Sequence, residues 1–112
     1  MSPVFNPRHQ GAITPILAAV SAVWRVPVMS ILSHDRHKTI AEARCAAYWL
    51  ARRLTRMSYP EIALMMHKHD HTTVIAGARG IDRKMKNDEW LRDTMNALLA
   101  ELATEDEKVI VQ

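Results

Sequence analysis

The segment from Ser58 to Ile75 constrains the fold more than any other part of this 112-residue chain. Ser58 and Glu61 have the spacing of a capping box, and Pro60 falls in the first turn of a helix, where its missing N–H costs nothing. Asp70 then offers a carboxylate as the N-cap of a second helix. The segment therefore predicts two short helices joined by a tight turn, which is a helix-turn-helix.

Apolar residues recur at helical spacing over most of the rest of the chain. Thr14-Pro15 predicts the start of a first helix, and Thr39 with Glu42 predicts a capping box at the start of a long one. The predicted helices cover residues 14–24, 28–32, 39–57, the two helices between 60 and 86, and 88–103. Gly77 and Gly80 each cost about 1 kcal/mol relative to Ala inside the second of those two helices, and we interpret both as allowing close helix approach. A chain of this length has room for one core.

We therefore predict an all-α, six-helix compact domain that contains a helix-turn-helix. It is expected to span residues 14–103, with a flexible leader at 1–13 and a flexible tail at 104–112. Termini of this kind are ordered only when they are tied to the domain.

Charge is distributed unevenly along the chain. Residues 1–79 hold 10 Lys and Arg against 4 Asp and Glu, a net charge of +6, whereas residues 80–112 hold 5 against 8, a net charge of −3. A solvated surface with random asymmetry would explain this alone. Together with a helix-turn-helix, the charge asymmetry favours a polyanionic ligand that binds the basic part of the chain, while the acidic part stays in solvent.

Several function classes lack a sequence signal. The single cysteine, Cys45, forms no intrachain disulfide and is expected to be a small buried packing residue in a cytoplasmic protein. The apolar runs are too short for a signal peptide or a membrane span. There is no G-x-x-x-x-G-K-[ST] motif, so we expect no nucleotide and no cofactor. No carboxylate pair or exposed thiol predicts an enzyme.

A histidine-rich run suggests a metal site as an alternative. His67 and His71 have the i, i+4 spacing that zinc sites use on a helix. The predicted turn lies between them, however, and no cysteine is near. We therefore expect no metal and assign these side chains to a surface that faces phosphate.

The sequence of the turn and of the second helix carries a family resemblance. The run Asp70-His71-Thr72-Thr73-Val74, with Ser58-x-Pro60-Glu61-Ile62 upstream, resembles the C-terminal DNA-binding domain of the bacterial replication initiator DnaA. The resemblance covers about residues 14–100. The family usually has Arg at His69, Pro at Ala43 and Gly-Gly at His67-Lys68. We expect these departures to affect the target sequence more than the fold.

Two sets of DNA-contacting residues are expected. Phosphate contacts are assigned to cationic and hydroxyl side chains: Lys38, Arg44, Arg52 and Thr55. The resemblance implies that the residues at or near the bases are Arg36, Tyr59, Pro60, Asp70, His71, Thr72 and Thr73. Arg36 would enter the minor groove, and Tyr59 and Pro60 would contact thymine methyl groups.

The predicted function is sequence-specific binding of double-stranded DNA at a site like the family's box, T-T-A-T-N-C-A-C-A. The chain would be a small nucleoid-associated regulator of transcription or of replication initiation. The alternative is a protein-interaction module that kept the fold and lost specific DNA binding. A surface around Tyr48 and Trp49 is the candidate for a protein partner, because two adjacent aromatic residues are not expected to face the same core.

Overall fold

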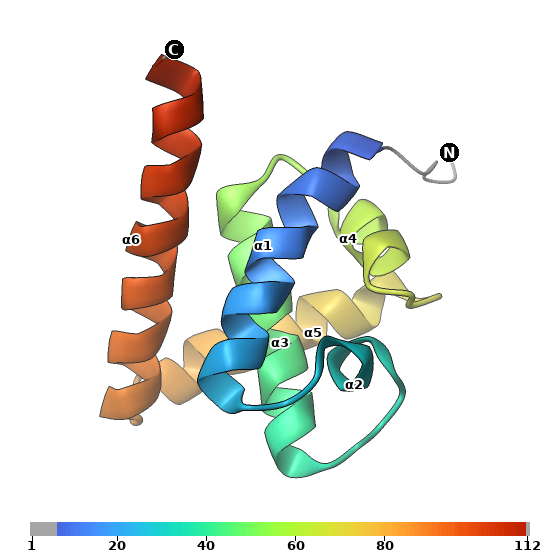
Figure 1. Cartoon of the computed structure of the whole chain (residues 1–112). Helices are drawn as coiled ribbons and strands as arrows, with labels where there is room; N and C mark the ends of the chain where they lie inside the picture. Colours follow the sequence, from blue (N-terminus) through green and yellow to red (C-terminus); the bar gives the residue numbers. More distant parts are fainter. Residues whose placement is uncertain (1–6, 112) are drawn as a thin grey trace.

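The computed structural model describes the backbone of residues 7–111 and the side chains of residues 11–103. Its helices are α1 (Pro7–Trp24), α2 (Val28–Leu32), α3 (Lys38–Leu54), α4 (Tyr59–Met65), α5 (His71–Met85) and α6 (Glu89–Val111). The described residues contain no strand, and the predicted six-helix all-α domain is confirmed. α6 lies at one side of the molecule and α2 and α4 lie at the other (Figure 1). No helix in the described part is long and apolar enough to cross a membrane.

The core is built around α3, which packs against all five other helices. Tyr48 and Trp49 are 1% and 3% exposed, because neighbouring helices surround α3. Trp49 Nε1 donates a hydrogen bond to Asp82 of α5 at 2.8 Å, and the Arg53 guanidinium lies 4.0 Å from the centroid of the Trp49 ring. Burial raises the pKa of Tyr48 to about 12. The predicted partner surface at these two residues is therefore wrong.

The first and last helices are longer than predicted. α1 begins at Pro7 rather than Thr14, and Ile13 is fully buried, so the predicted leader already contains helix and core. Pro15 indicated a start, but it lies inside α1, and Ile13 continues the apolar stripe of Ile16 and Val20 toward the N-terminus. α6 continues past residue 103 to Val111, because no Gly or Pro interrupts that stretch. Residues 1–6 of the predicted leader lie outside the described residues.

One of the two predicted capping boxes is present. The Glu61 backbone N–H donates to Ser58 Oγ at 3.3 Å, and the Ser58 N–H donates to Glu61 Oε1 at 2.9 Å. The box at Thr39 is wrong, since α3 begins at Lys38. The Glu42 carboxylate instead accepts from Trp24 Nε1 of α1 at 3.0 Å and from Lys84 Nζ of α5 at 3.2 Å. Glu42 therefore links three helices.

The absence of a side chain at Gly77 allows α5 to pack closely against α3, whereas Gly80 does not have this role. A Cβ atom at Gly77 would lie 2.8 Å from Cδ2 of Tyr48 and 3.0 Å from Sγ of Cys45, which is too close for an unshifted side chain. A Cβ atom at Gly80 would meet only the Arg83 guanidinium, at 3.8 Å. The predicted role of close helix approach is therefore correct for Gly77 and wrong for Gly80.

Candidate nucleic-acid interface

The turn between α4 and α5 is closed by backbone hydrogen bonds and by a side-chain cap. His67 has a left-handed backbone with φ of 59°, a conformation in which His is enriched among residues other than glycine. The Lys68 N–H then bonds back to the Ala63 carbonyl at 2.7 Å. Asp70 caps α5 by accepting from the Thr72 N–H at 2.9 Å. The predicted helix-turn-helix is present, although the chain has no glycine in the turn.

The first turn of α5 presents polar side chains to solvent. His71, Thr72 and Thr73 are exposed, and Val74 is buried and anchors the helix to the core. Hydrogen bonds from the side chain and backbone of Thr72 hold the pKa of Asp70 below its usual range, so the cap is ionised at neutral pH. An imidazole and two hydroxyls at the capped start of a helix are suited to hydrogen bonding with base edges.

A surface groove of about 300 Å³ connects the starts of the two helices. It is lined by Pro60, Ala63, Leu64, Lys68, His69 and His71. Pro60 and His71, predicted separately as base contacts, therefore share one hollow. Tyr59 is half-buried, and the Arg52 guanidinium covers its ring at 4.6 Å from the centroid. The apolar side chains of the groove are consistent with a contact to thymine methyl groups.

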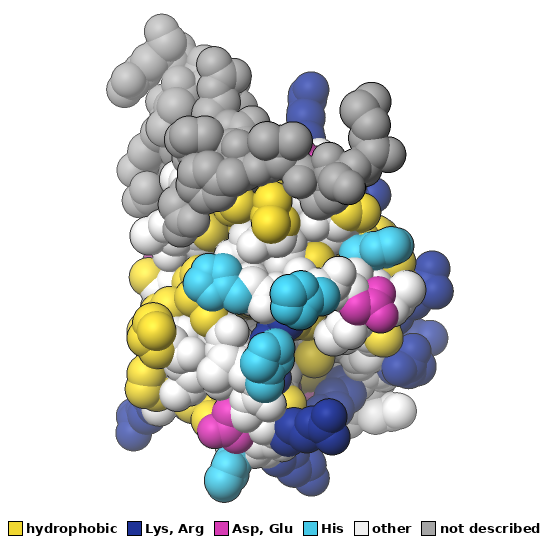
Figure 2. Space-filling model, turned by 90° about the vertical axis from the view of Figure 1, so that its right-hand side faces the viewer, with side chains coloured by type: hydrophobic (Ala, Val, Ile, Leu, Met, Phe, Trp, Pro, Cys, Tyr) yellow, Lys and Arg dark blue, Asp and Glu magenta, His cyan; other side chains and the backbone are white. Residues whose placement is uncertain are grey.

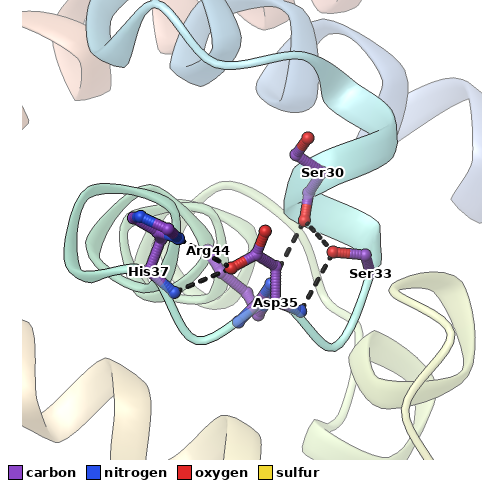
Figure 3. A network of polar contacts seen from close by, with 5 residues as sticks. All are labelled: Ser30, Ser33, Asp35, His37 and Arg44. Atoms are coloured by element: carbon purple, nitrogen blue, oxygen red, sulfur yellow. Dashed lines mark hydrogen bonds and ion pairs between the residues drawn. The ribbon is translucent and has the colours of Figure 1, made fainter.

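Arg36 is exposed in the loop between α2 and α3, and a chain of hydrogen bonds orders that loop (Figure 3). Ser33 Oγ donates to the Ser30 carbonyl at 2.6 Å and accepts from the Asp35 N–H at 3.1 Å. Asp35 Oδ1 accepts from the His37 N–H at 2.8 Å. That bond holds the pKa of Asp35 below its usual range. The guanidinium of Arg36 is therefore carried by a short, internally bonded loop.

The four predicted phosphate contacts differ in their surroundings. Lys38 is exposed at the first residue of α3. Arg52 is also exposed, but it donates to the Met57 carbonyl at 2.9 Å. Thr55 Oγ1 donates to the Ala51 carbonyl at 2.6 Å and accepts from the Met57 N–H at 3.1 Å.

Arg44 is half-buried and is engaged with the end of α2. Its Nε donates to the Ile31 carbonyl at 2.7 Å, and a terminal nitrogen donates to the Ser30 carbonyl at 3.1 Å. Arg44 and Thr55 thus have roles inside the fold that their sequence positions did not indicate. Of the four predicted phosphate contacts, Lys38 has the clearest path to a phosphate.

Histidines gather on the side of the molecule where α2 and α4 lie, with Lys and Arg side chains beside them (Figure 2). The exposed histidines of the described residues are His34, His37, His67, His69 and His71. Among the residues with described side chains, no group of three or more His, Cys, Asp or Glu is arranged to hold a metal ion. The Lys and Arg side chains beside the histidines are suited to contact with a polyanion.

A second hollow, of about 360 Å³, lies between the start of α3 and the middle of α5. Arg36 and Lys38 line it together with residues of α5, so the loop and α5 border the same space. Cys45 also lines it and is half-buried rather than fully buried as predicted. Burial raises the pKa of the Cys45 thiol, which keeps it protonated and a poor nucleophile at neutral pH.

Comparison with known proteins identifies the family of this fold and surface. The family model for the bacterial DnaA protein helix-turn-helix matches residues 13–81. The chain belongs to the bacterial DnaA helix-turn-helix family. The matched residues include every predicted base and phosphate contact, whereas α6 lies beyond them. DnaA helix-turn-helix domains bind DNA, so membership supports DNA binding.

Similar DnaA proteins and a solved structure match the chain over part of their own length. The chromosomal replication initiator DnaA of Caulobacter sp. strain K31 is 33% identical over 90 residues, which are 80% of this chain and 18% of that protein. The DnaA of Lachnoclostridium phytofermentans is 31% identical over 87 residues, or 78% and 19% of the two chains. The crystal structure of a DNA replication initiation factor matches with a TM-score of 0.79 at 28% identity, over 88% of this chain and 30% of that one. The chain thus spans about a fifth of these DnaA proteins.

Proposed function

We propose that the chain binds double-stranded DNA sequence-specifically, with α5 in the major groove and the Arg36 loop in the adjacent minor groove. The observation that carries this proposal is the capped first turn of α5, which presents His71, Thr72 and Thr73 to solvent. Polar side chains at this place in a helix-turn-helix are the ones that meet base edges. Asp70 and the groove beside Pro60 complete the base-reading surface.

The biological role we propose is that of a small nucleoid-associated regulator of transcription or replication initiation. Similar proteins are named chromosomal replication initiators, which supports a target like the DnaA box. The base-reading residues retain the Asp-His-Thr-Thr run, whereas His69 occupies the place of the usual Arg. We expect the target to differ from T-T-A-T-N-C-A-C-A at the positions nearest His69.

A protein-interaction module is the second candidate. Trp90 favours it, rather than the Tyr48 and Trp49 surface expected from the sequence. Trp90 is 54% exposed and contacts the Trp24 ring edge-on, with 5.7 Å between ring centroids. Aromatic residues are enriched at protein interfaces. The two candidates differ in whether the isolated protein distinguishes a box duplex from a scrambled duplex of equal composition.

Substituting Lys38 by Ala tests the phosphate contact that we propose for this residue. We expect weaker binding to box and scrambled duplexes alike, and a slope of log affinity against log salt that is reduced by about one unit, because one phosphate contact is lost. Fluorescence anisotropy titrations across a series of salt concentrations measure both quantities.

Lys86→Ala is the matched control, because Lys86 is exposed at the far end of α5. This control should retain the wild-type slope. An unchanged slope for Lys38→Ala would remove Lys38 from the phosphate-contacting set. Equal wild-type affinity for box and scrambled duplexes would favour the interaction module.

A further inference from the structure

Lys68 joins the two parts of the proposed interface. Its Nζ donates a hydrogen bond to the Ser33 carbonyl at 2.6 Å, across 35 positions of sequence. Lys68 lies in the turn that precedes α5, and Ser33 is the C-cap of α2, where the loop that carries Arg36 begins. The bond therefore connects the turn of the helix-turn-helix to the base of the Arg36 loop.

Arg44 stabilises the same helix end from α3. It donates to the Ile31 and Ser30 carbonyls at 2.7 Å and 3.1 Å, which are among the last carbonyls of α2. Burial, followed by the charge of Arg44, lowers the pKa of Lys68. Two cations thus converge on one short stretch of backbone, Lys68 at the Ser33 carbonyl and Arg44 at the Ile31 and Ser30 carbonyls.

The other hydrogen bonds of the loop are local. Those of Ser33 Oγ and Asp35 Oδ1 join groups that are two or three residues apart, as Figure 3 shows. They fix the shape of the loop but do not relate it to α5. The Lys68 bond does relate it, because Lys68 is two residues before the N-cap Asp70.

We propose that Lys68 is a positioning residue that holds the Arg36 loop at a fixed distance from the first turn of α5, so that both grooves are engaged together. The inference rests on the proposed function, in which Arg36 enters the minor groove. A loop held in its bound position loses less conformational freedom on binding, which raises affinity without a new contact to DNA.

Lys68→Met tests this proposal in a double-mutant cycle with Arg36→Ala. Binding is measured on two duplexes that share the major-groove site and differ in an A·T or a G·C minor-groove flank. Lys68→Met should weaken binding to the A·T-flanked duplex roughly 2- to 10-fold and change the G·C-flanked duplex little. In the Arg36→Ala background it should add no further loss, because the residue that it positions is absent.

Two control variants accompany the double-mutant cycle. Lys68→Arg keeps a cationic donor and should retain the preference for the A·T flank. Lys86→Met removes the same charge from an exposed site and should not alter that preference. An equal loss from Lys68→Met on both duplexes, additive with Arg36→Ala, would overturn the proposal and assign Lys68 to direct phosphate contact.

A measurement without DNA separates this inference from the proposed function. NMR order parameters report the fast motion of backbone amides. In the free protein, those of residues 34–37 should fall in Lys68→Met and return in Lys68→Arg, while those of α3 and α5 stay constant. Unchanged order parameters in the loop would overturn the proposal that Lys68 holds the loop in place. If the wild-type protein binds no duplex, the proposed function fails, and the order parameters still decide whether Lys68 holds the loop.

Discussion

Replacing Thr72 by Val should lower the affinity for the cognate duplex by about 1–3 kcal/mol, which is roughly 5- to 150-fold. The Thr72 side chain is exposed on the first turn of α5, and its backbone N–H is already occupied by Asp70. Valine keeps the shape and the methyl contact, so the loss reports the hydroxyl, including its bond to Asp70. A scrambled duplex of equal composition should show little change, because its binding depends on phosphate contacts. Anisotropy titrations at one fixed salt concentration compare the two duplexes.

Thr94→Val serves as the control for this substitution. Thr94 is half-buried on α6, and that helix lies at the side of the molecule opposite α2 and α4 (Figure 1). The Thr94→Val substitution should leave the affinities for both duplexes unchanged. A uniform loss from Thr72→Val on cognate and scrambled duplexes would instead move Thr72 from the base-reading set to the phosphate-contacting set.

Gly77→Ala should destabilise the fold by about 1–3 kcal/mol, the usual effect of overpacking a filled core. Its Cβ atom would lie 2.8 Å from a ring carbon of the buried Tyr48 side chain, so α5 must move away from α3. For a domain of this size, each 1 kcal/mol corresponds to a fall in Tm of about 4–8 °C. Thermal and urea unfolding followed by circular dichroism measure the change.

Gly80→Ala is the matched variant, for which we expect the opposite effect on stability. Its Cβ atom meets only the flexible end of Arg83, so the higher helix propensity of alanine should raise stability by up to about 1 kcal/mol. Two identical substitutions, three residues apart on one helix, should therefore change Tm in opposite directions. Equal effects at the two sites would contradict the assignment of Gly77 to the α3–α5 contact.

Most of the features that the sequence predicted correctly are local ones. The capping box of Ser58 and Glu61 and the N-cap Asp70 involve groups that are two or three residues apart. Their geometry follows from the helix itself, so the order of residues is sufficient to predict it. The same local signals placed His71, Thr72 and Thr73 on one helical turn.

The features that the sequence did not predict depend on distant partners. Glu42 was predicted to cap a helix, but its carboxylate accepts hydrogen bonds from Trp24 of α1 and Lys84 of α5. Arg44 and Lys68 bond to carbonyls of α2 and its C-cap, which only the folded chain brings near them. The burial of Trp49 follows from the central place of α3, which helical periodicity alone does not indicate.

Selection of binding sites from random duplex DNA tests the central claim most directly. If the first turn of α5 and the Arg36 loop contact bases as we propose, the wild-type protein should enrich one asymmetric motif with an A·T flank, related to the DnaA box and altered where His69 replaces the usual Arg. The same selection with Thr72→Val should enrich that motif less. Recovery of no motif, with equal affinity for all duplexes, would contradict sequence-specific reading by this helix-turn-helix.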